Sequence, residues 1–284
     1  MWGRRFNGED SLNTPDRDDG YGEGWMVMGD NLLQRIFRSG RAARSISVPQ
    51  DYRVYAIGDI HGRADLLQKL HELILDDATD AGRDAKKFAI YLGDYVDRGL
   101  QSKEVIDILL DSSLPDFETV YLKGNHDDQF LEFMDDTGAG EDWLKIGGDA
   151  TVYSYGVRIP QDVAPAMRLM FIQRELRNAV PKRHMEFLSK LELTKEIGDY
   201  FFVHAGINPA RPLNKQIPED LLWIRNEFLD SEVNFGKVVV HGHSMTRELD
   251  IRDNRIGIDT GAYISNKLTC LVLEGSTKRF LSTD

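Results

Sequence analysis

Five short stretches of this sequence gather histidine, aspartate and asparagine. They read GDIHG, GDYVDRG, GNHD, HAG and HGH, in that order along the chain. Each stretch directly follows an apolar run that is rich in β-forming residues. Five of the seven histidines lie in these stretches, and the other two, His71 and His184, lie in runs with helical spacing. Imidazole, carboxylate and amide groups are ligands of divalent metal ions, so this concentration predicts a metal site.

The spacing of these residues indicates two metal ions. Asp59 and His61 lie two residues apart after a strand and can point at one ion. Asn125, His204 and one histidine of the HGH stretch can serve a second ion. Asp94 could bridge the two, because two cations about 4 Å apart need a shared ligand. Oxygen and imidazole donors without thiolate suit Mn, Fe or Zn.

The elements that must position these residues alternate between strands and helices after Tyr52. RVYAIG, KFAIYLG and ETVYLKG are typical of strands, whereas ADLLQKLHELILDDA, SKEVIDILLDS and DQFLEFMDD have apolar residues at helical spacing. This alternation predicts βαβ units in a layered α/β domain. In the second half, DYFFVHAG, KVVVHGH, LDIRDNRIGID and KLTCLVLE predict strands with more antiparallel pairing. Ligands bind beyond the carboxyl ends of strands in such sheets, so we expect the five stretches to meet there.

The chain divides by composition into two parts. Residues 1–50 are rich in Gly, Asp and Asn in their first half and show no sustained period, so we expect a poorly ordered extension. Residues 51–284 form the predicted domain. Within it, residues 137–183 are expected to be an insertion beside the site that shapes specificity.

Composition and charge exclude several classes of protein. The 284 residues carry a net charge of -12, which argues against a broad basic surface for nucleic acid. No apolar run approaches the roughly 20 residues that span a bilayer, and the N-terminus has no apolar signal core. The single cysteine, Cys270, excludes an intrachain disulfide. We therefore expect a cytoplasmic protein that is not bound to a membrane.

The order GDIHG, GDYVDRG, GNHD, HAG and GH resembles the phosphoprotein phosphatase family of calcineurin-like metallophosphatases. The resemblance extends from about Asp51 to the C-terminus. DLLWIR and IDTGA are similar to the bacterial-type serine/threonine protein phosphatases. The resemblance implies an α/β (α+β) metallophosphatase catalytic domain over residues 51–284. It also implies a four-layer fold, in which a central β-sandwich is flanked by helices and carries a di-metal site at its strand ends.

The resemblance assigns ligands position by position. Those implied for the first metal are Asp59, His61 and Asp94. Those implied for the second metal are Asp94, Asn125, His204 and His243. His243 is preferred to His241 because the last ligand of the family follows a small residue, here Gly242. The expected metal is Mn, with Fe or Zn also compatible with these donors.

The resemblance also implies a mechanism. A hydroxide that bridges the two metals attacks phosphorus directly, and the leaving oxygen needs a proton as its bond breaks. His126 is the candidate acid, oriented by Asp97. Arg98 and Arg225 are the candidates for binding phosphoryl oxygens, with Arg211 a weaker third. An ordinary salt bridge is the alternative role for each arginine.

Several functions fit the motifs. The first is a phosphomonoesterase that acts on phosphoserine or phosphothreonine in a phosphoprotein or phosphopeptide partner. The alternative is a symmetrical dinucleoside-tetraphosphate hydrolase, a group that generally lacks the second carboxylate of GDYVD, here Asp97. A nuclease-like phosphodiesterase typically ends in GHxH, whereas this chain has Met245 at that position. A catalytically inactive phospho-binding module would lack ligands, and every expected ligand is present.

Overall fold

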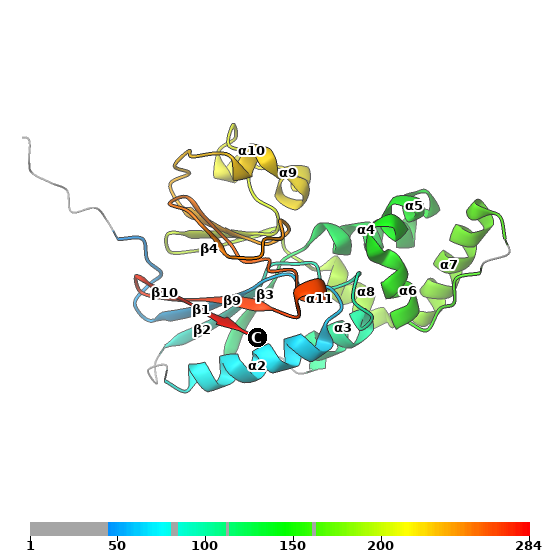
Figure 1. Cartoon of the computed structure of the whole chain (residues 1–284), viewed down its shortest axis with the longest axis horizontal. Coiled ribbons are helices and arrows are strands. Elements are labelled where there is room, and N and C mark those ends of the chain that lie inside the picture. Colours follow the sequence, from blue (N-terminus) through cyan, green and yellow to red (C-terminus); the bar gives the residue numbers. More distant parts are fainter. Residues whose placement is uncertain (1–44, 81–84, 112–113, 161–162) are drawn as a thin grey trace, which may run out of the picture. The chain divides into compact units, whose positions relative to one another are not determined.

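Two mixed β-sheets of five strands each face one another in the computed structural model (Figure 1). The structure describes residues 45–284, apart from 81–84, 112–113 and 161–162. The extension predicted over residues 1–50 lies outside the described residues as far as residue 44. Near its end, Val48 is already buried in the core between the two sheets.

The first sheet has the order β10-β9-β1-β2-β3. Its strands are β1 (Tyr52–Ile57), β2 (Lys86–Tyr91), β3 (Phe117–Tyr121), β9 (Thr269–Glu274) and β10 (Thr277–Ser282). The pairs β1–β2 and β2–β3 are parallel, as the βαβ pattern predicts. The C-terminal strands β9 and β10 extend this sheet with antiparallel pairing.

The second sheet has the order β4-β5-β6-β8-β7. Its strands are β4 (Thr194–Ile197), β5 (Tyr200–Val203), β6 (Val238–His241), β7 (Asp250–Ile251) and β8 (Arg255–Gly257). The central strands β5, β6 and β8 are parallel, and the edge strands β4 and β7 are antiparallel to their neighbours. The predicted antiparallel character of the second half is therefore confined to the sheet edges and to β9 and β10.

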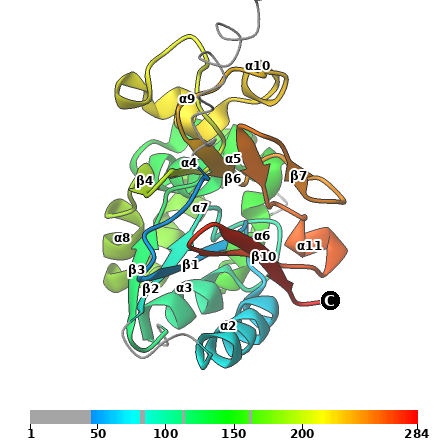
Figure 2. The ribbon, with the colours of Figure 1, turned by 90° about the vertical axis from the view of Figure 1, so that its left-hand side faces the viewer.

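Helices cover the outer faces of both sheets (Figure 2). The longer helices are α2 (Ala64–Ala78), α3 (Ser102–Asp111), α4 (Asn125–Asp135), α7 (Pro165–Ala179) and α8 (Lys182–Ser189). The shorter ones are α5 (Gly140–Trp143), α6 (Asp149–Ser154), α9 (Pro218–Trp223), α10 (Asn226–Leu229) and α11 (Ala262–Ser265), with η1 (Thr137–Ala139), η2 (Leu144–Gly148) and η3 (Leu213–Lys215) as single turns. None of the described helices is long and apolar enough to cross a membrane.

Alternation along the strands explains the layers. Successive side chains of a strand point to opposite faces. Val54 and Ala56 of β1 therefore join the core between the sheets, whereas Tyr55 and Ile57 join the core beneath the helices. On the far side, β5 packs against α9 and α10 through a third core that includes Phe228. The predicted arrangement of a β-sandwich flanked by helices is confirmed.

The boundaries of some elements differ from the predictions for physical reasons. Helix α4 begins at Asn125, before the predicted DQFLEFMDD, because the Asp127 carboxylate accepts the Gly124 N–H (2.9 Å) and so caps an earlier start. The run LDIRDNRIGID is divided into the antiparallel pair β7 and β8. Strands β4 and β10 lie at sheet edges with partly exposed polar residues, so their sequences lack a clear strand pattern.

Candidate active site

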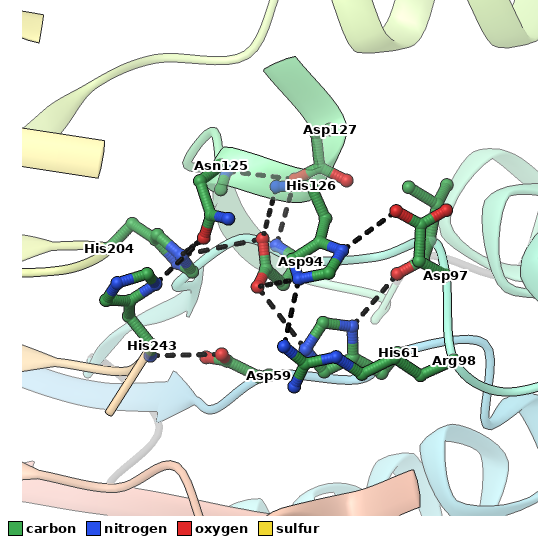
Figure 3. Close-up of polar contacts among 12 residues, drawn as sticks. Asp59, His61, Asp94, Asp97, Arg98, Asn125, His126, Asp127, His204 and His243 are labelled. Atoms are coloured by element: carbon green, nitrogen blue, oxygen red, sulfur yellow. Dashed lines mark hydrogen bonds and ion pairs between the residues drawn. The ribbon is translucent and has the colours of Figure 1, made fainter. Parts of the chain in front are cut away.

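The five stretches converge at the ends of the strands they follow. Asp59 and His61 follow β1, and Asp94, Asp97 and Arg98 follow β2. Asn125 and His126 form the first turn of α4 after β3. His204 follows β5, and His243 follows β6. These side chains point toward one another around Asp94 (Figure 3). The convergence predicted from the strand ends is therefore found.

Asp94 lies between two groups of possible ligands. Its Oδ2 is 3.3 Å from His61 Nε2 and 4.0 Å from His126 Nε2. Its Oδ1 is 3.5 Å from His204 Nε2. The groups His61–Asp94–His126 and Asp94–His204–His243 each offer ligand atoms within 4.8 Å of one another. The Asp94 carboxylate is thus placed where it can contribute a ligand atom to both groups.

Two backbone carbonyls fix the histidine tautomers on either side of Asp94. His61 Nδ1 is 3.0 Å from the Val96 carbonyl, and His204 Nδ1 is 2.8 Å from the Leu92 carbonyl. Each Nδ1 must donate its proton to that carbonyl, which leaves a lone pair on each Nε2. Both lone pairs face the Asp94 carboxylate, an arrangement that is unfavourable unless a cation lies between them. Burial lowers the pKa of His61 to about 3, which keeps its imidazole neutral.

Asn125, His243 and Asp59 complete the donor set. Asn125 Oδ1 is 2.9 Å from His204 Nε2 and 2.8 Å from His243 Nδ1. Among the described residues, Asp59 Oδ1, His61 Nε2 and His243 Nε2 are buried with no hydrogen-bond partner. Buried polar atoms without hydrogen-bond partners are costly. Other buried atoms in the described part of the chain, such as His241 Nε2, also have none, but His61 Nε2 lies 3.3 Å from Asp94 Oδ2, a place that fits a bound cation. The donor set of imidazole, amide and carboxylate fits divalent metals.

His126 makes different contacts from the other histidines. Its Nδ1 is 2.8 Å from Asp97 Oδ2, and both side chains are buried. Burial would lower the pKa of His126, but the carboxylates of Asp94 and Asp97 outweigh it and raise the pKa above its ordinary value. An Arg98 guanidinium nitrogen lies 3.1 Å from Nε2. A guanidinium at this nitrogen disfavours a metal ion there, so His126 suits proton transfer better than metal binding.

Asp97 is held by residues from the helical segment that follows α4. Trp143 Nε1 donates to Asp97 Oδ2 at 2.9 Å, and the Thr151 hydroxyl donates to Oδ1 at 2.6 Å. The Asp97 N–H donates to Thr151 Oγ1 (2.8 Å) and to Ser102 Oγ (3.1 Å). Both carboxylate oxygens and the backbone N–H of Asp97 are therefore held by hydrogen bonds.

The three candidate arginines have different surroundings. Arg98 stacks over the Tyr263 ring, with 4.9 Å between guanidinium and ring centre. Arg225 Nη1 lies 3.4 Å from both the His243 carbonyl and Ser244 Oγ. Within the described residues, neither Arg98 nor Arg225 has a carboxylate in salt-bridge contact. Arg211, by contrast, forms a salt bridge with Asp220 (3.3 Å), which is the alternative role considered for it.

His241 lies outside the cluster. Its Nδ1 is 3.1 Å from the Gly242 carbonyl, and its ring packs edge-on against Phe228 with the ring centres 5.1 Å apart. Burial lowers the pKa of His241 to about 4. Of the two histidines in HGH, His243 is the one that the structure places beside Asn125.

The loops that carry the cluster are strained. Five of the seven described non-glycine residues with positive φ belong to them: His61, Asp94, Asp97, Arg98 and His243. Such conformations cost of order 1–3 kcal/mol each and concentrate at functional sites.

Two glycines let the backbone approach the site carboxylates. Gly124 has an ordinary φ of -95°, so a tight turn is not what requires it. A Cβ at Gly124 would lie 2.0 Å from Asp94 Oδ1, and a Cβ at Gly242 would lie 2.0 Å from Asp59 Oδ1. Both positions therefore need glycine for space.

Sequence reasoning missed Asp259, Trp143 and Thr151 as site residues. Asp259 is buried against Asp59, and burial raises its pKa to about 6. It follows β8 as the other acidic residues follow their strands, so its position in IDTGA is a signal that could have found it. Trp143 and Thr151 carry no such signal, because their partner Asp97 is 46 and 54 residues away in sequence.

Comparisons with known proteins agree with this geometry. Residues 52–268 match the calcineurin-like phosphoesterase family. The chain is 30% identical to serine/threonine-protein phosphatase 2 of Escherichia coli (strain K12) over 226 residues, which are 76% of this chain and 90% of that protein. It is 24% identical over 233 residues to the asymmetrical bis(5′-nucleosyl)-tetraphosphatase PrpE of Anoxybacillus flavithermus (strain DSM 21510 / WK1), covering 76% of this chain and 88% of that protein.

A solved structure shares the fold. The crystal structure described as "a putative diadenosine tetraphosphatase" aligns with a TM-score of 0.55 and 20% identity, over 81% of this chain and 93% of that one. The family match covers most of the chain, and the chain therefore belongs to the calcineurin-like phosphoesterase family. It is a metallophosphatase with candidate ligands for divalent metals.

Proposed function

We propose that this calcineurin-like phosphoesterase is a phosphomonoesterase that removes phosphate from serine and threonine residues of proteins. The observation that carries the proposal is the buried His126–Asp97 pair (2.8 Å) beside Asp94. A proton donor at that place suits a leaving group that is a poor alkoxide, such as the side chain of serine or threonine. The 30% identity to a bacterial serine/threonine phosphatase supports the same conclusion.

The metal ions would be held by the residues that converge on Asp94. Asp59, His61 and Asp94 would hold one, and Asp94 with Asn125, His204 and His243 would hold the other. Two divalent cations, when bound there, supply Lewis acidity to the phosphoryl group and a water of lowered pKa as the nucleophile. We propose Mn as the metal, since hard oxygen and borderline nitrogen donors are combined without sulfur.

With substrate bound, His126 Nε2 would carry the proton for the leaving oxygen. Asp97 is ionised and accepts from His126 Nδ1, so Nε2 is the ring atom that faces the reacting group. In the structure, the Arg98 guanidinium donates to Nε2 at 3.1 Å, a contact that requires this nitrogen to be unprotonated. A phosphate that draws Arg98 onto its own oxygens would release Nε2 and let it take up the proton that it later donates.

Arg98 and Arg225 would bind the phosphoryl oxygens. Each guanidinium lies beside a histidine of the cluster, Arg98 at His126 and Arg225 at the carbonyl of His243. Positive charge that is already in place stabilises the charge that develops on these oxygens. Because Arg211 is in a salt bridge with Asp220, we do not assign it to the substrate.

A dinucleoside tetraphosphatase is the second candidate. It is favoured by the 24% identity to an asymmetrical tetraphosphatase, whereas the sequence motifs had suggested a symmetrical one. A tetraphosphate chain needs several cationic contacts beyond the reacting phosphate. At the centre, the described arginines without a carboxylate partner are Arg98 and Arg225, and the nearby Arg63 is paired with Asp65 (2.6 Å). This charge distribution suits a single phosphoryl group better.

The test is hydrolysis by purified protein stripped of metal with a chelator. The substrates are a phosphothreonine peptide, a phosphotyrosine peptide, p-nitrophenyl phosphate and diadenosine tetraphosphate, each with Mn, Zn or Mg. We expect Mn-dependent turnover of the phosphothreonine peptide. Turnover of diadenosine tetraphosphate with inert peptides would replace the proposal by the second candidate. No turnover with any metal would point to a phospho-binding module.

A further inference from the structure

We infer that Trp143 and Thr151 position the proton-donating pair, and that the segment from α5 to α6 is a support for His126 and Asp97. The sequence predicted that this segment, as part of residues 137–183, would shape substrate specificity. The inference rests on the proposed role of His126 as the acid. It assigns Trp143 and Thr151 as positioning residues, because they act through Asp97 and do not themselves contact the reacting atoms.

Trp143 and Thr151 each donate a hydrogen bond to the Asp97 carboxylate, one to each oxygen. Trp143 Nε1–H donates to Oδ2 at 2.9 Å, the same oxygen that His126 Nδ1 contacts at 2.8 Å. The Thr151 hydroxyl donates to Oδ1 at 2.6 Å. The side chain of Asp97 is fully buried, so no water competes for these oxygens. These hydrogen bonds fix the orientation of the Asp97 carboxylate relative to the His126 ring.

The direction of each hydrogen bond follows from the number of protons available. A carboxylate can only accept, and a threonine hydroxyl has one proton. Since that proton goes to Asp97 Oδ1, the contact between Ser102 Oγ and Thr151 Oγ1 (3.0 Å) must be donated by Ser102. Ser102 therefore donates to Thr151 and Thr151 donates to Asp97, while His126 Nδ1 donates to Asp97 from the other side.

The indole is closely packed. Its ring stacks on Phe130 (5.3 Å between ring centres) and on Phe133 (5.0 Å), with 27° between the planes in each case. A Cβ at Gly148 would come within 2.4 Å of the indole, so glycine lets the backbone close over it. A buried tryptophan needs a partner for its N–H, and a carbonyl would suffice. Here the partner is the carboxylate that orients His126.

The same segment supports the strained turn after β2. Asp97 and Arg98 have φ of 71° and 67°, values that non-glycine residues seldom adopt. The Gly147 carbonyl accepts the Arg98 N–H at 3.1 Å, and the Thr151 hydroxyl accepts the Asp97 N–H at 2.8 Å. The segment from α5 to α6 thus holds the backbone of this turn as well as the Asp97 side chain.

Residues that position the acid should affect the rate in a way that depends on the leaving group. Protonation of the leaving oxygen matters most when that oxygen is basic, as in serine, threonine or phenol. It matters little for 4-nitrophenolate, which departs without help. Loss of support for Asp97 should therefore slow the poor leaving groups selectively, whereas general damage to the fold or to the metal ligands should slow all substrates alike.

The experiment compares variants on substrates that differ only in the leaving group. Thr151→Val removes the hydroxyl at constant shape, and Trp143→Phe removes the N–H while keeping an aromatic ring. Thr151→Ser keeps the hydroxyl and is the matched control. Each is assayed with Mn on phenyl phosphate and 4-nitrophenyl phosphate, and its metal content and unfolding transition are measured. His126→Asn is assayed in parallel.

We expect Thr151→Val and Trp143→Phe to lower kcat on phenyl phosphate by about 10–100-fold, the range typical of residues that orient a functional group from outside. Their kcat on 4-nitrophenyl phosphate, and KM on both substrates, should change little. Thr151→Ser should retain the wild-type ratio of kcat on phenyl phosphate to kcat on 4-nitrophenyl phosphate. Equal loss on both substrates, or a ratio in Thr151→Val that matches the wild type, would overturn the inference.

His126→Asn separates the inference from the proposed function. If His126→Asn shows the selective loss and the Thr151 and Trp143 variants do not, the acid role stands and the positioning role is wrong. If His126→Asn slows both substrates equally, the acid role itself is wrong and the positioning role falls with it. The Thr151 pair keeps the test valid even where Trp143→Phe folds poorly.

Discussion

The two sides of Asp94 use buried histidines for different purposes. His61 and His204 each meet a backbone carbonyl through Nδ1, at Val96 and Leu92, which leaves a lone pair on Nε2 facing Asp94. His126 meets the Asp97 carboxylate through Nδ1 and a guanidinium at Nε2. Burial alone does not distinguish these histidines. What distinguishes them is the partner of the Nδ1 and Nε2 atoms, which separates the proposed metal ligands from the proposed proton donor.

The supports of the two sides also differ. The ligand side is built by the ends of β1, β2, β5 and β6, where the carbonyls of Leu92 and Val96, just after β2, hold two of the imidazoles. The side of His126 depends on a helical segment that is distant in sequence and reaches Asp97 through Trp143 and Thr151. The proposed ligands are thus held at the strand ends, whereas the proposed acid is held through Asp97 by the helical segment from α5 to α6. Five substitutions test this contrast.

Asp94→Asn should have the largest effect, because it removes the charge shared by both sides. We expect metal content to fall from two ions per chain to one or none. Activity on a phosphothreonine peptide should fall by more than the roughly 10⁴-fold that marks the upper end for loss of an acid or base. Elemental analysis and steady-state kinetics measure the two effects. Retention of two tightly bound ions would show that Asp94 bridges nothing.

His126→Asn should reduce kcat on a phosphothreonine peptide by about 10²–10⁴-fold, the usual contribution of general acid–base catalysis. Its metal content should remain that of the wild type, because His126 turns its ring nitrogens toward Asp97 and Arg98. Elemental analysis alongside kinetics tests both statements. Loss of one metal ion in this variant would show that His126 is a metal ligand and not the acid.

His243→Asn and His241→Asn form a matched pair two residues apart. His243 lies beside Asn125 (2.8 Å), so its loss should weaken the second metal by at least about 100-fold, the upper end for residues outside the ligand set. His241 packs on Phe228, so its loss should lower stability and leave metal affinity intact. Titration calorimetry with Mn and thermal unfolding compare them. The reverse pattern would make His241 the ligand.

Asp259→Asn should have the smallest effect. Asp259 adds a negative charge next to Asp59, and its Oδ1 accepts the Gly261 N–H at 2.9 Å. Removing that charge should weaken Mn binding by about 10-fold, the lower end for outer partners of a ligand. The fold should persist, since asparagine keeps the acceptor oxygen. Unchanged Mn affinity by calorimetry would limit Asp259 to a structural role.

The sequence predicted most of the ligand side and little of its support. The stretches that follow β1, β2, β3, β5 and β6 identify residues that lie together, because parallel strand ends meet at one edge. The helix over residues 64–78 is α2 with the same bounds, since its apolar spacing and burial agree. These features are local, and a local pattern is visible in a sequence.

The contacts of Asp97 could not be predicted from the sequence, because they join segments that are distant along the chain. Trp143 and Thr151 sit in WLKIGGDATVYSY, where nothing indicates that an indole N–H and a hydroxyl converge on a carboxylate. The expected role of residues 137–183 as an insertion for specificity stays a prediction. Within this segment, Trp143 and Thr151 contact the Asp97 carboxylate. The need for glycine at position 124 was equally hidden, since it comes from close approach to Asp94, a residue of another loop.

The most direct test is anomalous diffraction from crystals of the Mn-loaded protein. The central claim is that Asp94 holds two metal ions while His126 holds none. It predicts two Mn peaks that both contact Asp94, one also reaching Asp59 and His61 and the other reaching Asn125, His204 and His243. A single peak, or a peak bound to His126 Nε2, would contradict the claim and reassign His126 as a ligand.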